Sequence, residues 1–234
     1  MYTKEQFAKM IDHTLLRPDA TREEVEKFLR EAREYHFAAA YVFPCWVPLA
    51  VAELEGSDVK IGSVVGFPFG ANTRRTKVFE ARTLLELGAR ELDMVINIGR
   101  LKSGDYAACR REIEEVAMSV RRVELTRDMR SALLKVIIET CYLTDEEKEI
   151  ACKIALDAGA DFIKTSTGMG PKGASAEDVR LIRRVVGPEM GVKAAGGIKD
   201  VDTALLMLDS GANRIGTSRG PELLNSYEPF DKNS

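Results

Sequence analysis

The chain has 234 residues, of which 45% are hydrophobic and 30% are charged, a composition typical of a globular protein with a substantial core. Its 34 basic and 37 acidic residues give a formal net charge of −3, which argues against nucleic acid or a membrane surface as the main partner. The most apolar stretch, residues 37–52, is too short to span a bilayer and contains two prolines. The first ten residues are polar and do not resemble a signal peptide. Four scattered cysteines are typical of a protein with reduced thiols, so we expect a cytoplasmic location.

Helical patterns alternate with short β-rich runs along the whole chain. Residues 21–24 and 144–147 each form a capping box that opens a predicted helix, and residues 175–178 are a weaker version of the same signal. The predicted strands cover residues 10–15, 39–43, 60–65, 92–96, 134–138, 162–165, 191–194 and 214–216. Strands that alternate with helices indicate a parallel sheet of βαβ units.

Eight such units in 234 residues are typical of a single-domain (β/α)8 TIM barrel, which we predict for residues 1–234. A short N-terminal extension precedes the barrel in this interpretation, and a polar C-terminal tail follows it. A doubly wound open sheet is the main alternative, but it usually has fewer strands.

A Gly-Ala pair recurs three times at the predicted junction between a helix and the next strand, at residues 88–89, 159–160 and 211–212. Glycine suits the left-handed conformation that follows a helix end, so each pair marks an αβ turn. Five residues beyond these glycines lie Asp93, Lys164 and Gly216. Equivalent units would place the three residues at the same depth in the sheet, facing the same way.

Four predicted strands carry a charge in an otherwise apolar run, and Glu139 adds a fifth charge at a strand end. The four residues are Asp93, Lys135, Lys164 and Lys193. A barrel strand is buried on both faces, so an unpaired charge there costs several kcal/mol. One interpretation is a set of structural ion pairs inside the barrel; the other, favoured by four charges near strand ends, is a catalytic site.

Lys164 and Lys193 lie on consecutive predicted strands, which are neighbours about 4.8 Å apart in a barrel. Two close ammonium groups disfavour each other's charge, so one lysine pKa is expected to fall toward neutrality. A neutral lysine is a nucleophile that can form a Schiff base with a carbonyl compound. Asp93 can then relay protons or orient water.

This chemistry needs no metal and no organic cofactor, and none is predicted. The chain has only two histidines, and its four cysteines (Cys45, Cys109, Cys141 and Cys152) include no Cys-x-x-Cys pair. No zinc site follows from these spacings, and the cysteines are expected to be reduced thiols.

Small-residue loops follow the last three predicted strands, at residues 165–168, 194–197 and 216–218. In barrels, the loops after the last two strands commonly bind phosphate through backbone N–H groups. Gly-Gly pairs also occur in ordinary turns, but their position beside the lysines favours a phosphorylated substrate. The candidate phosphate-binding residues of these loops are Gly168, Gly196, Gly197, Gly216 and Ser218, and Thr167 is expected to line the substrate site.

The sequence motifs resemble those of the deoxyribose-phosphate aldolase family over about residues 10–220. The matching segments are residues 11–16 (Ile-Asp-His-Thr-Leu-Leu), 64–68 (Val-Val-Gly-Phe-Pro), 70–73 (Gly-Ala-Asn-Thr), 93–99 (Asp-Met-Val-Ile-Asn-Ile-Gly), 135–140 (Lys-Val-Ile-Ile-Glu-Thr), 164–168 (Lys-Thr-Ser-Thr-Gly) and 193–197 (Lys-Ala-Ala-Gly-Gly). The resemblance implies a class I aldolase on a (β/α)8 barrel that reversibly cleaves 2-deoxy-D-ribose 5-phosphate to D-glyceraldehyde 3-phosphate and acetaldehyde.

The resemblance also assigns roles to individual residues. Lys164 matches the Schiff-base lysine, Lys193 the second lysine that lowers its pKa, and Asp93 the proton-relay carboxylate. Positions that contact phosphate in the family correspond to Gly196, Gly197 and Ser218, and positions that line the site correspond to Asp12, Thr14 and Lys135.

The chain departs from the family pattern at several positions. Tyr41 and Phe43 replace a common Cys and Asn, which predicts a bulkier pocket. Arg219 replaces a serine and could either bind phosphate or point to solvent. The pair at residues 74–75 adds positive charge that we assign to the solvated surface, and Tyr227 receives no role.

Two other functions compete with this aldolase. One is a Schiff-base aldolase or isomerase of the same fold that acts on another sugar phosphate, and the other is a non-catalytic sugar-phosphate sensor. In each case the expected partner is a small phosphorylated sugar, with no nucleic acid or membrane. The family's habit suggests a homo-oligomer, either a dimer or a tetramer.

Overall fold

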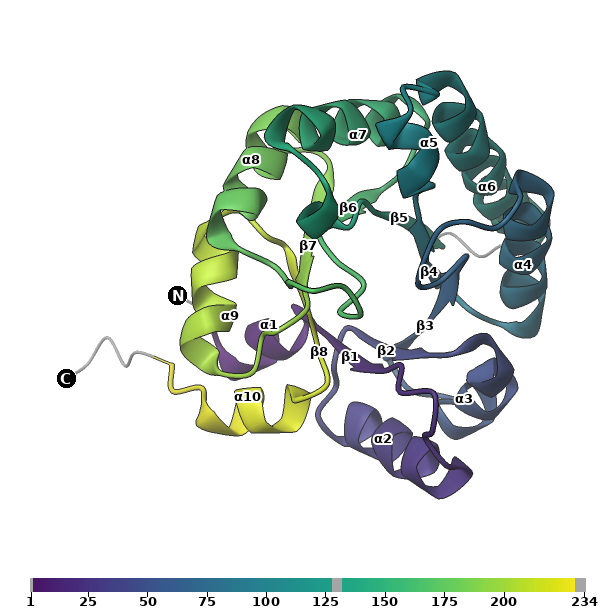
Figure 1. Ribbon diagram of the computed structural model, residues 1–234. Helices are drawn as coiled ribbons and strands as arrows, with labels where there is room; N and C mark the ends of the chain where they lie inside the picture. The colour runs from purple at the N-terminus through teal and green to yellow at the C-terminus, as the bar shows by residue number, and fades with distance from the viewer. Residues whose placement is uncertain (1, 128–131, 230–234) are drawn as a thin grey trace.

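The computed structural model describes residues 2–127 and 132–229, and these form a closed barrel of eight parallel strands surrounded by helices (Figure 1). The predicted polar C-terminal tail ends in residues 231–234, which lie outside the described residues. The strands pair in sequence order, and β8 closes the barrel against β1. They are β1 (Ile11–Leu15), β2 (Ala39–Val42), β3 (Lys60–Val65), β4 (Glu91–Val95), β5 (Leu133–Ile137), β6 (Phe162–Lys164), β7 (Gly191–Ala195) and β8 (Arg214–Thr217).

The TIM-barrel prediction is therefore confirmed, and each predicted strand agrees with the observed one to within one residue at either end. The described residues also contain ten α-helices and two short 3-10 helices. They are α1 (Lys4–Ala8), α2 (Arg22–Glu34), η1 (Pro44–Trp46), α3 (Val47–Glu53), α4 (Arg74–Leu87), α5 (Ile98–Lys102), α6 (Tyr106–Arg127), η2 (Thr140–Tyr142), α7 (Asp145–Asp157), α8 (Ala176–Val186), α9 (Val201–Asp209) and α10 (Gly220–Ser226). Helix α1 precedes the first strand, α10 follows the last, and the others connect strands. Along the part of the chain that is described, no helix combines the length and the apolar character needed to cross a bilayer.

The predicted capping boxes form at the starts of α2 and α7. In each, the threonine side chain accepts a hydrogen bond from the backbone three residues later, and the glutamate there accepts one from the threonine backbone. Ser175 caps α8 through its side chain alone. These local bonds satisfy backbone groups that the helix itself leaves free, so sequence alone locates the helix starts.

The three Gly-Ala turns also form as predicted. Gly88, Gly159 and Gly211 have φ angles of +118°, +80° and +111°, which side-chain-bearing residues rarely adopt. Asp93, Lys164 and Gly216 are each the third residue of their strand. The three repeats thus place Asp93, Lys164 and Gly216 at the same position of their strands.

Alternate strand residues separate the apolar core from the barrel interior. Leu92, Met94, Val136, Ile163 and Val192 are fully buried in the layer between the strands and the helices. The residues between them point inward and include the charged side chains. Bulky interior rings lie over glycines on the next strand, since a Cβ on Gly62 or Gly191 would overlap the ring of Tyr41 or Phe162.

The segment before the barrel is anchored by the last helix. Phe7 in α1 packs on Tyr227, with ring centroids 4.4 Å apart. The hydroxyl of Tyr227 donates a hydrogen bond to the backbone oxygen of Tyr2 at 2.7 Å. Tyr227 is therefore a structural residue that connects the end of α10 to the N-terminal segment. Figure 1 shows α1 and α10 side by side.

Candidate active site

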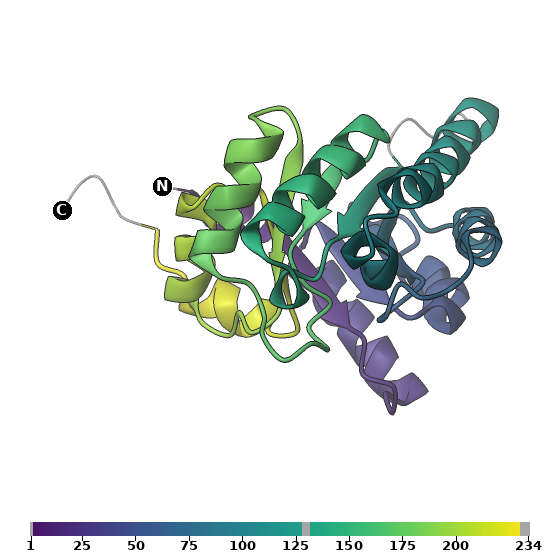
Figure 2. The same cartoon turned by 45° about the horizontal axis from the view of Figure 1, so that its top comes forward.

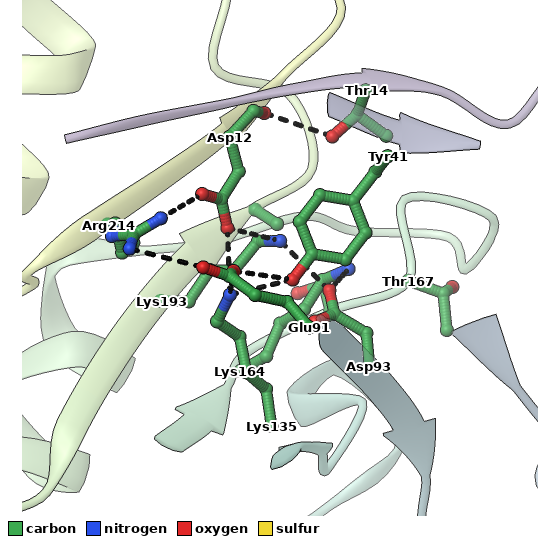
Figure 3. Close-up of polar contacts among 12 residues, drawn as sticks. Asp12, Thr14, Tyr41, Glu91, Asp93, Lys135, Lys164, Thr167, Lys193 and Arg214 are labelled. Carbon is green, nitrogen blue, oxygen red and sulfur yellow. Dashed lines mark hydrogen bonds and ion pairs between the residues drawn. The ribbon is translucent and has the colours of Figure 1, made fainter. Parts of the chain in front are cut away.

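The predicted trio of Asp93, Lys164 and Lys193 meets inside the barrel. The Nζ atoms of Lys164 and Lys193 donate to the same oxygen, Oδ2 of Asp93, at 2.7 and 2.9 Å (Figure 3). All three side chains are at most 3% exposed. The other carboxylate oxygen of Asp93, Oδ1, is buried without a partner among the described residues, so it is free to accept a hydrogen bond from a bound molecule.

A second layer of charges lies deeper in the barrel, below this trio. Asp12 accepts from Lys193 at 2.7 Å, from Lys135 at 3.2 Å and from Arg214 at 2.5 Å. Glu91 pairs with Lys135 and accepts a hydrogen bond from the hydroxyl of Tyr41 at 3.0 Å. Each buried carboxylate in this layer is thus compensated by cations, as burial requires.

The pKa of Lys164 is lowered to about 8. Burial is the main cause, because it penalises the charged amine, and the nearby Lys193 ammonium adds to the effect. Asp93 opposes both by stabilising the Lys164 cation. The lowered pKa agrees with the sequence-based expectation, although burial is a larger cause than the neighbouring lysine.

The two central carboxyl groups remain ionised. Burial alone would raise the pKa of Asp93, but the cations of Lys164 and Lys193 hold it well below its usual range. Lys135 and Lys193 do the same for the pKa of Asp12. Between pH 5 and 9, Asp93 is therefore an anion beside a lysine that loses its proton near pH 8.

Lys164 is the one member of the trio that reaches a cavity at the carboxyl ends of the strands. This cavity has a volume of about 550 Å³, and its walls come from the loops after β1, β6, β7 and β8. Figure 2 shows the loops after β1 and β6 extending on the same side of the barrel. The lining residues are Thr14, Leu15, Leu16, Arg17, Pro18, Lys164, Thr167, Gly168, Met169, Ala195, Gly196, Gly197, Ile198, Lys199, Gly216, Thr217 and Ser218.

The structure brings most of the predicted site residues to this cavity. Thr14, Thr167 and the five candidate phosphate-binding residues (Gly168, Gly196, Gly197, Gly216 and Ser218) all line it. Asp12 and Lys135 do not: both are fully buried in the deeper charged layer. Lys135 is in register with Phe162 on β6 rather than with Lys164, which sets its depth in the barrel. That Asp12 and Lys135 line the bound substrate stays a prediction.

The loops after β6 and β7 interlock at glycine positions. The backbone N–H of Ala174 donates to the carbonyl oxygens of Ala195 and Gly196, both at 3.1 Å. A Cβ on Gly173 would lie 2.0 Å from the Gly196 oxygen, so only glycine allows this approach. Within residues 2–127 and 132–229, the backbone N–H groups of Gly196 and Gly197 find no acceptor, which leaves them available to an anion.

Three departures from the family pattern are settled by geometry. Tyr41 is fully buried below the cavity and does not line it, so the prediction of a bulkier pocket is wrong for this residue. Phe43 is half-buried against Phe67, with ring centroids 6.0 Å apart, and does not line the cavity either. Arg219 is exposed at the start of α10, outside the cavity lining, in agreement with the solvent alternative.

Two functional candidates were not predicted from sequence. Lys199 lines the cavity, is exposed, and takes part in none of the ion pairs of the described residues. Arg17 also lines it but pairs with Asp19 and Glu24. The position of Lys199, two residues after Gly197, was an available signal, whereas nothing in the sequence placed Arg17 at the cavity.

The sequence predicts Glu139 as a charge at a strand end, and in the structure its carboxylate contacts the loop after β6. Its carboxylate accepts hydrogen bonds from the hydroxyl and backbone N–H of Thr167. Thr167 in turn accepts from the N–H of Met169 at 3.0 Å. Glu139 thus fixes the loop that follows Lys164.

The chain resembles known aldolases over nearly its whole length. A family model described as DeoC/LacD family aldolase matches residues 7–223. The deoxyribose-phosphate aldolase of Thermoanaerobacter sp. (strain X514) is 52% identical over 220 residues, which cover 94% of this chain and 96% of the relative. The deoxyribose-phosphate aldolase of Thermococcus gammatolerans is 57% identical over 219 residues, 93% of this chain and 94% of the relative.

Solved structures give the same result for the fold. A putative deoxyribose-phosphate aldolase from Coccidioides immitis superposes with a TM-score of 0.90 at 37% identity, covering 96% of this chain and 86% of the other. A deoxyribose phosphate aldolase from Aeropyrum pernix, described as having a unique tetrameric structure, gives 0.87 at 36% identity, with 96% and 92% covered.

Proposed function

Because the chain belongs to the DeoC/LacD family of aldolases, we propose that it is a class I aldolase that reversibly cleaves 2-deoxy-D-ribose 5-phosphate to D-glyceraldehyde 3-phosphate and acetaldehyde. The observation that carries the proposal is the place of Lys164. It is a buried lysine with a pKa lowered to about 8, it contacts an ionised carboxylate, and it lines the floor of a cavity. These are the properties of a Schiff-base nucleophile.

In this mechanism, the neutral Lys164 amine attacks the aldehyde carbon C1 of the open-chain sugar, and loss of water leaves an iminium ion. The iminium withdraws the electron pair of the C2–C3 bond. That bond breaks as the C3 hydroxyl gives up its proton, which releases D-glyceraldehyde 3-phosphate and leaves an enamine on Lys164. Protonation of C2 and hydrolysis then release acetaldehyde and restore the amine.

In this scheme Asp93 moves these protons, and Lys193 supplies the neighbouring positive charge. Asp93 uses Oδ2 for both lysines and keeps Oδ1 free, so it can bind a hydroxyl or a water beside Lys164 without losing its lysine contacts. Lys193 contacts Asp12 and Asp93 together, which supports it as the cation that remains when Lys164 is neutral.

The phosphate group is proposed to bind at the glycine-rich wall of the cavity. The free N–H groups of Gly196 and Gly197 supply donors, Ser218 supplies a hydroxyl, and the exposed ammonium of Lys199 supplies charge. Backbone donors and one cation suit a phosphate dianion. Lys164 lines the same cavity, so one bound sugar phosphate can contact both the lysine and this wall. No metal or organic cofactor takes part in this scheme.

We also propose that the chain forms a homo-oligomer, a dimer or a tetramer. The support is its likeness to the Aeropyrum pernix aldolase, which is described as a tetramer. Analytical ultracentrifugation would test this, and a monomer at micromolar concentration would contradict it.

The test of the reaction is reductive trapping. Sodium borohydride is added with 2-deoxyribose 5-phosphate, and the labelled peptide is mapped by mass spectrometry, with Lys164→Ala and Lys164→Arg run in parallel. We expect the label on Lys164 in the wild type and no acetaldehyde release from either variant. Full turnover by a folded variant would place the chemistry elsewhere, and binding without turnover of any aldol substrate would support the sensor alternative.

A further inference from the structure

Tyr41 lies directly beneath the two active-site lysines, at a position where the sequence showed only a departure from the family pattern. Its ring is fully buried inside the barrel, and the ammonium of Lys193 lies 3.6 Å from the ring centroid (Figure 3). The ammonium of Lys164 lies farther away, at 5.9 Å. The face of an aromatic ring attracts cations, and this attraction is strongest in sites without water.

The ring cannot move away from this position. On its far side, β3 carries Gly62, where a Cβ would lie 2.6 Å from three ring atoms, so the ring fills the space that a side chain would take. The hydroxyl donates to Glu91 at 3.0 Å and accepts from Lys135 at 2.6 Å. Buried among carboxylates, Tyr41 has its pKa raised well above the usual value and keeps its proton.

Lys193 is therefore enclosed by groups that stabilise a cation, with Asp12 and Asp93 on one side and the ring face on the other. Lys164 has only Asp93 as an ion-pair partner among the described residues. The two lysines share one carboxylate oxygen of Asp93, but the Tyr41 ring is close to Lys193 and farther from Lys164. Because two adjacent ammonium groups repel each other, the lysine that is better stabilised as a cation keeps its proton. The other lysine is then the neutral nucleophile.

We propose that Tyr41 is a positioning residue that holds the ammonium of Lys193 at Asp93 and so selects Lys164 as the neutral, nucleophilic lysine. This inference rests on the proposed Schiff-base function. Without the ring, the Lys193 cation can withdraw into the vacated space, and its repulsion of a proton on Lys164 weakens. The ring also attracts a Lys164 cation directly, but at 5.9 Å this opposing effect is the smaller one.

The charged groups around the two lysines come from several neighbouring strands. Besides the ring, they are Asp12 on β1, Glu91 and Asp93 on β4, Lys135 on β5 and Arg214 on β8. Replacing Tyr41 by leucine or by phenylalanine removes the same hydroxyl contacts with Glu91 and Lys135, but only the leucine variant also loses the ring. A change in pH dependence then reports on the ring.

The experiment compares Tyr41→Phe, which keeps the ring, with Tyr41→Leu, which removes it. The readout is the acidic limb of kcat/KM for 2-deoxyribose 5-phosphate cleavage, together with the pH dependence of borohydride trapping at Lys164. We expect Tyr41→Phe to keep the wild-type limb. We expect Tyr41→Leu to move it about half to one pH unit upward, with activity about three- to tenfold lower at pH 7 and recovered at high pH.

Two further variants keep the test decisive. Tyr41→Met fills much of the same volume and replaces Tyr41→Leu if that variant does not fold. Phe162→Leu removes another ring of the barrel interior, one that lies over Lys135 at 5.2 Å, and should leave the limb unchanged. An unmoved limb in the folded Leu or Met variant overturns the proposal, as does an equal shift in Tyr41→Phe.

Borohydride labelling of the wild-type enzyme distinguishes a failure of the proposed function from a failure of the proposed role of Tyr41. If borohydride fails to label wild-type Lys164, the proposed function is wrong. If Lys164 is labelled and the limb does not respond to loss of the ring, only the role of Tyr41 is wrong.

Discussion

Replacing Lys193 by methionine, which removes its charge and keeps most of its volume, should make Lys164 a much weaker nucleophile at neutral pH. Both ammonium groups contact Oδ2 of Asp93, at 2.7 and 2.9 Å, so the two nitrogens lie within about 5.6 Å of each other. At an effective dielectric constant of about 20, their repulsion is about 3 kcal/mol, or about two pKa units. Loss of Lys193 also leaves Asp12 and Asp93 less compensated, which acts in the same direction.

Activity at pH 7 should fall because Lys164 must lose its proton before it can attack. With a pKa of about 8, about one Lys164 in ten is a free amine at pH 7. A rise of about two units reduces that fraction to about one in a thousand. We therefore expect kcat/KM at pH 7 to fall about 100-fold in Lys193→Met and to recover as the pH approaches 10.

The assay is acetaldehyde release measured from pH 6 to 10.5, with Lys193→Arg as the control that retains a positive charge. The acidic limb should lie near pH 8 in the wild type and about two units higher in Lys193→Met, with thermal unfolding showing that both variants are folded. An unchanged limb would refute the reasoning, because burial alone would then account for the lowered pKa. Activity that is lost equally at all pH values would show instead that Lys193 acts in a later proton transfer.

Three more results are expected. Asp93→Asn should lower kcat about 100-fold or more by removing the proton acceptor, while borohydride still labels Lys164; loss of the label would mean that Asp93 is needed for Schiff-base formation itself. Lys199→Gln should raise KM for the phosphorylated substrate about tenfold, and Arg219→Gln, outside the cavity, should not; equal effects would move the phosphate site toward α10. Gly191→Ala should destabilise the fold by about 1–3 kcal/mol, because its Cβ would lie 2.3 Å from the Phe162 ring, whereas Gly99→Ala in α5, with no atom closer than 3.7 Å, should not; chemical denaturation measures both.

The barrel could be predicted because its signals are local. Threonine caps at residues 21 and 144, and the glycines that end three helices, act through bonds and backbone conformations within a few residues. Asp93, Lys164 and Lys193 could be predicted for a related reason. A charge in an apolar strand costs free energy unless it is compensated, so a strand that carries one already indicates a site.

The depth of each charge within the barrel depended on tertiary structure, because strand register is set between distant segments. Lys135 has the same sequence signal as Lys164, yet pairing with Phe162 places it in the layer below the cavity. Likewise, the sequence contained Tyr41 but not its contact with Lys193, which depends on the space over Gly62 on the next strand. The order of residues along the chain was enough to show which side chains enter the barrel. Which of them meet a substrate, and which support it from beneath, depends on how eight staggered strands close into a ring.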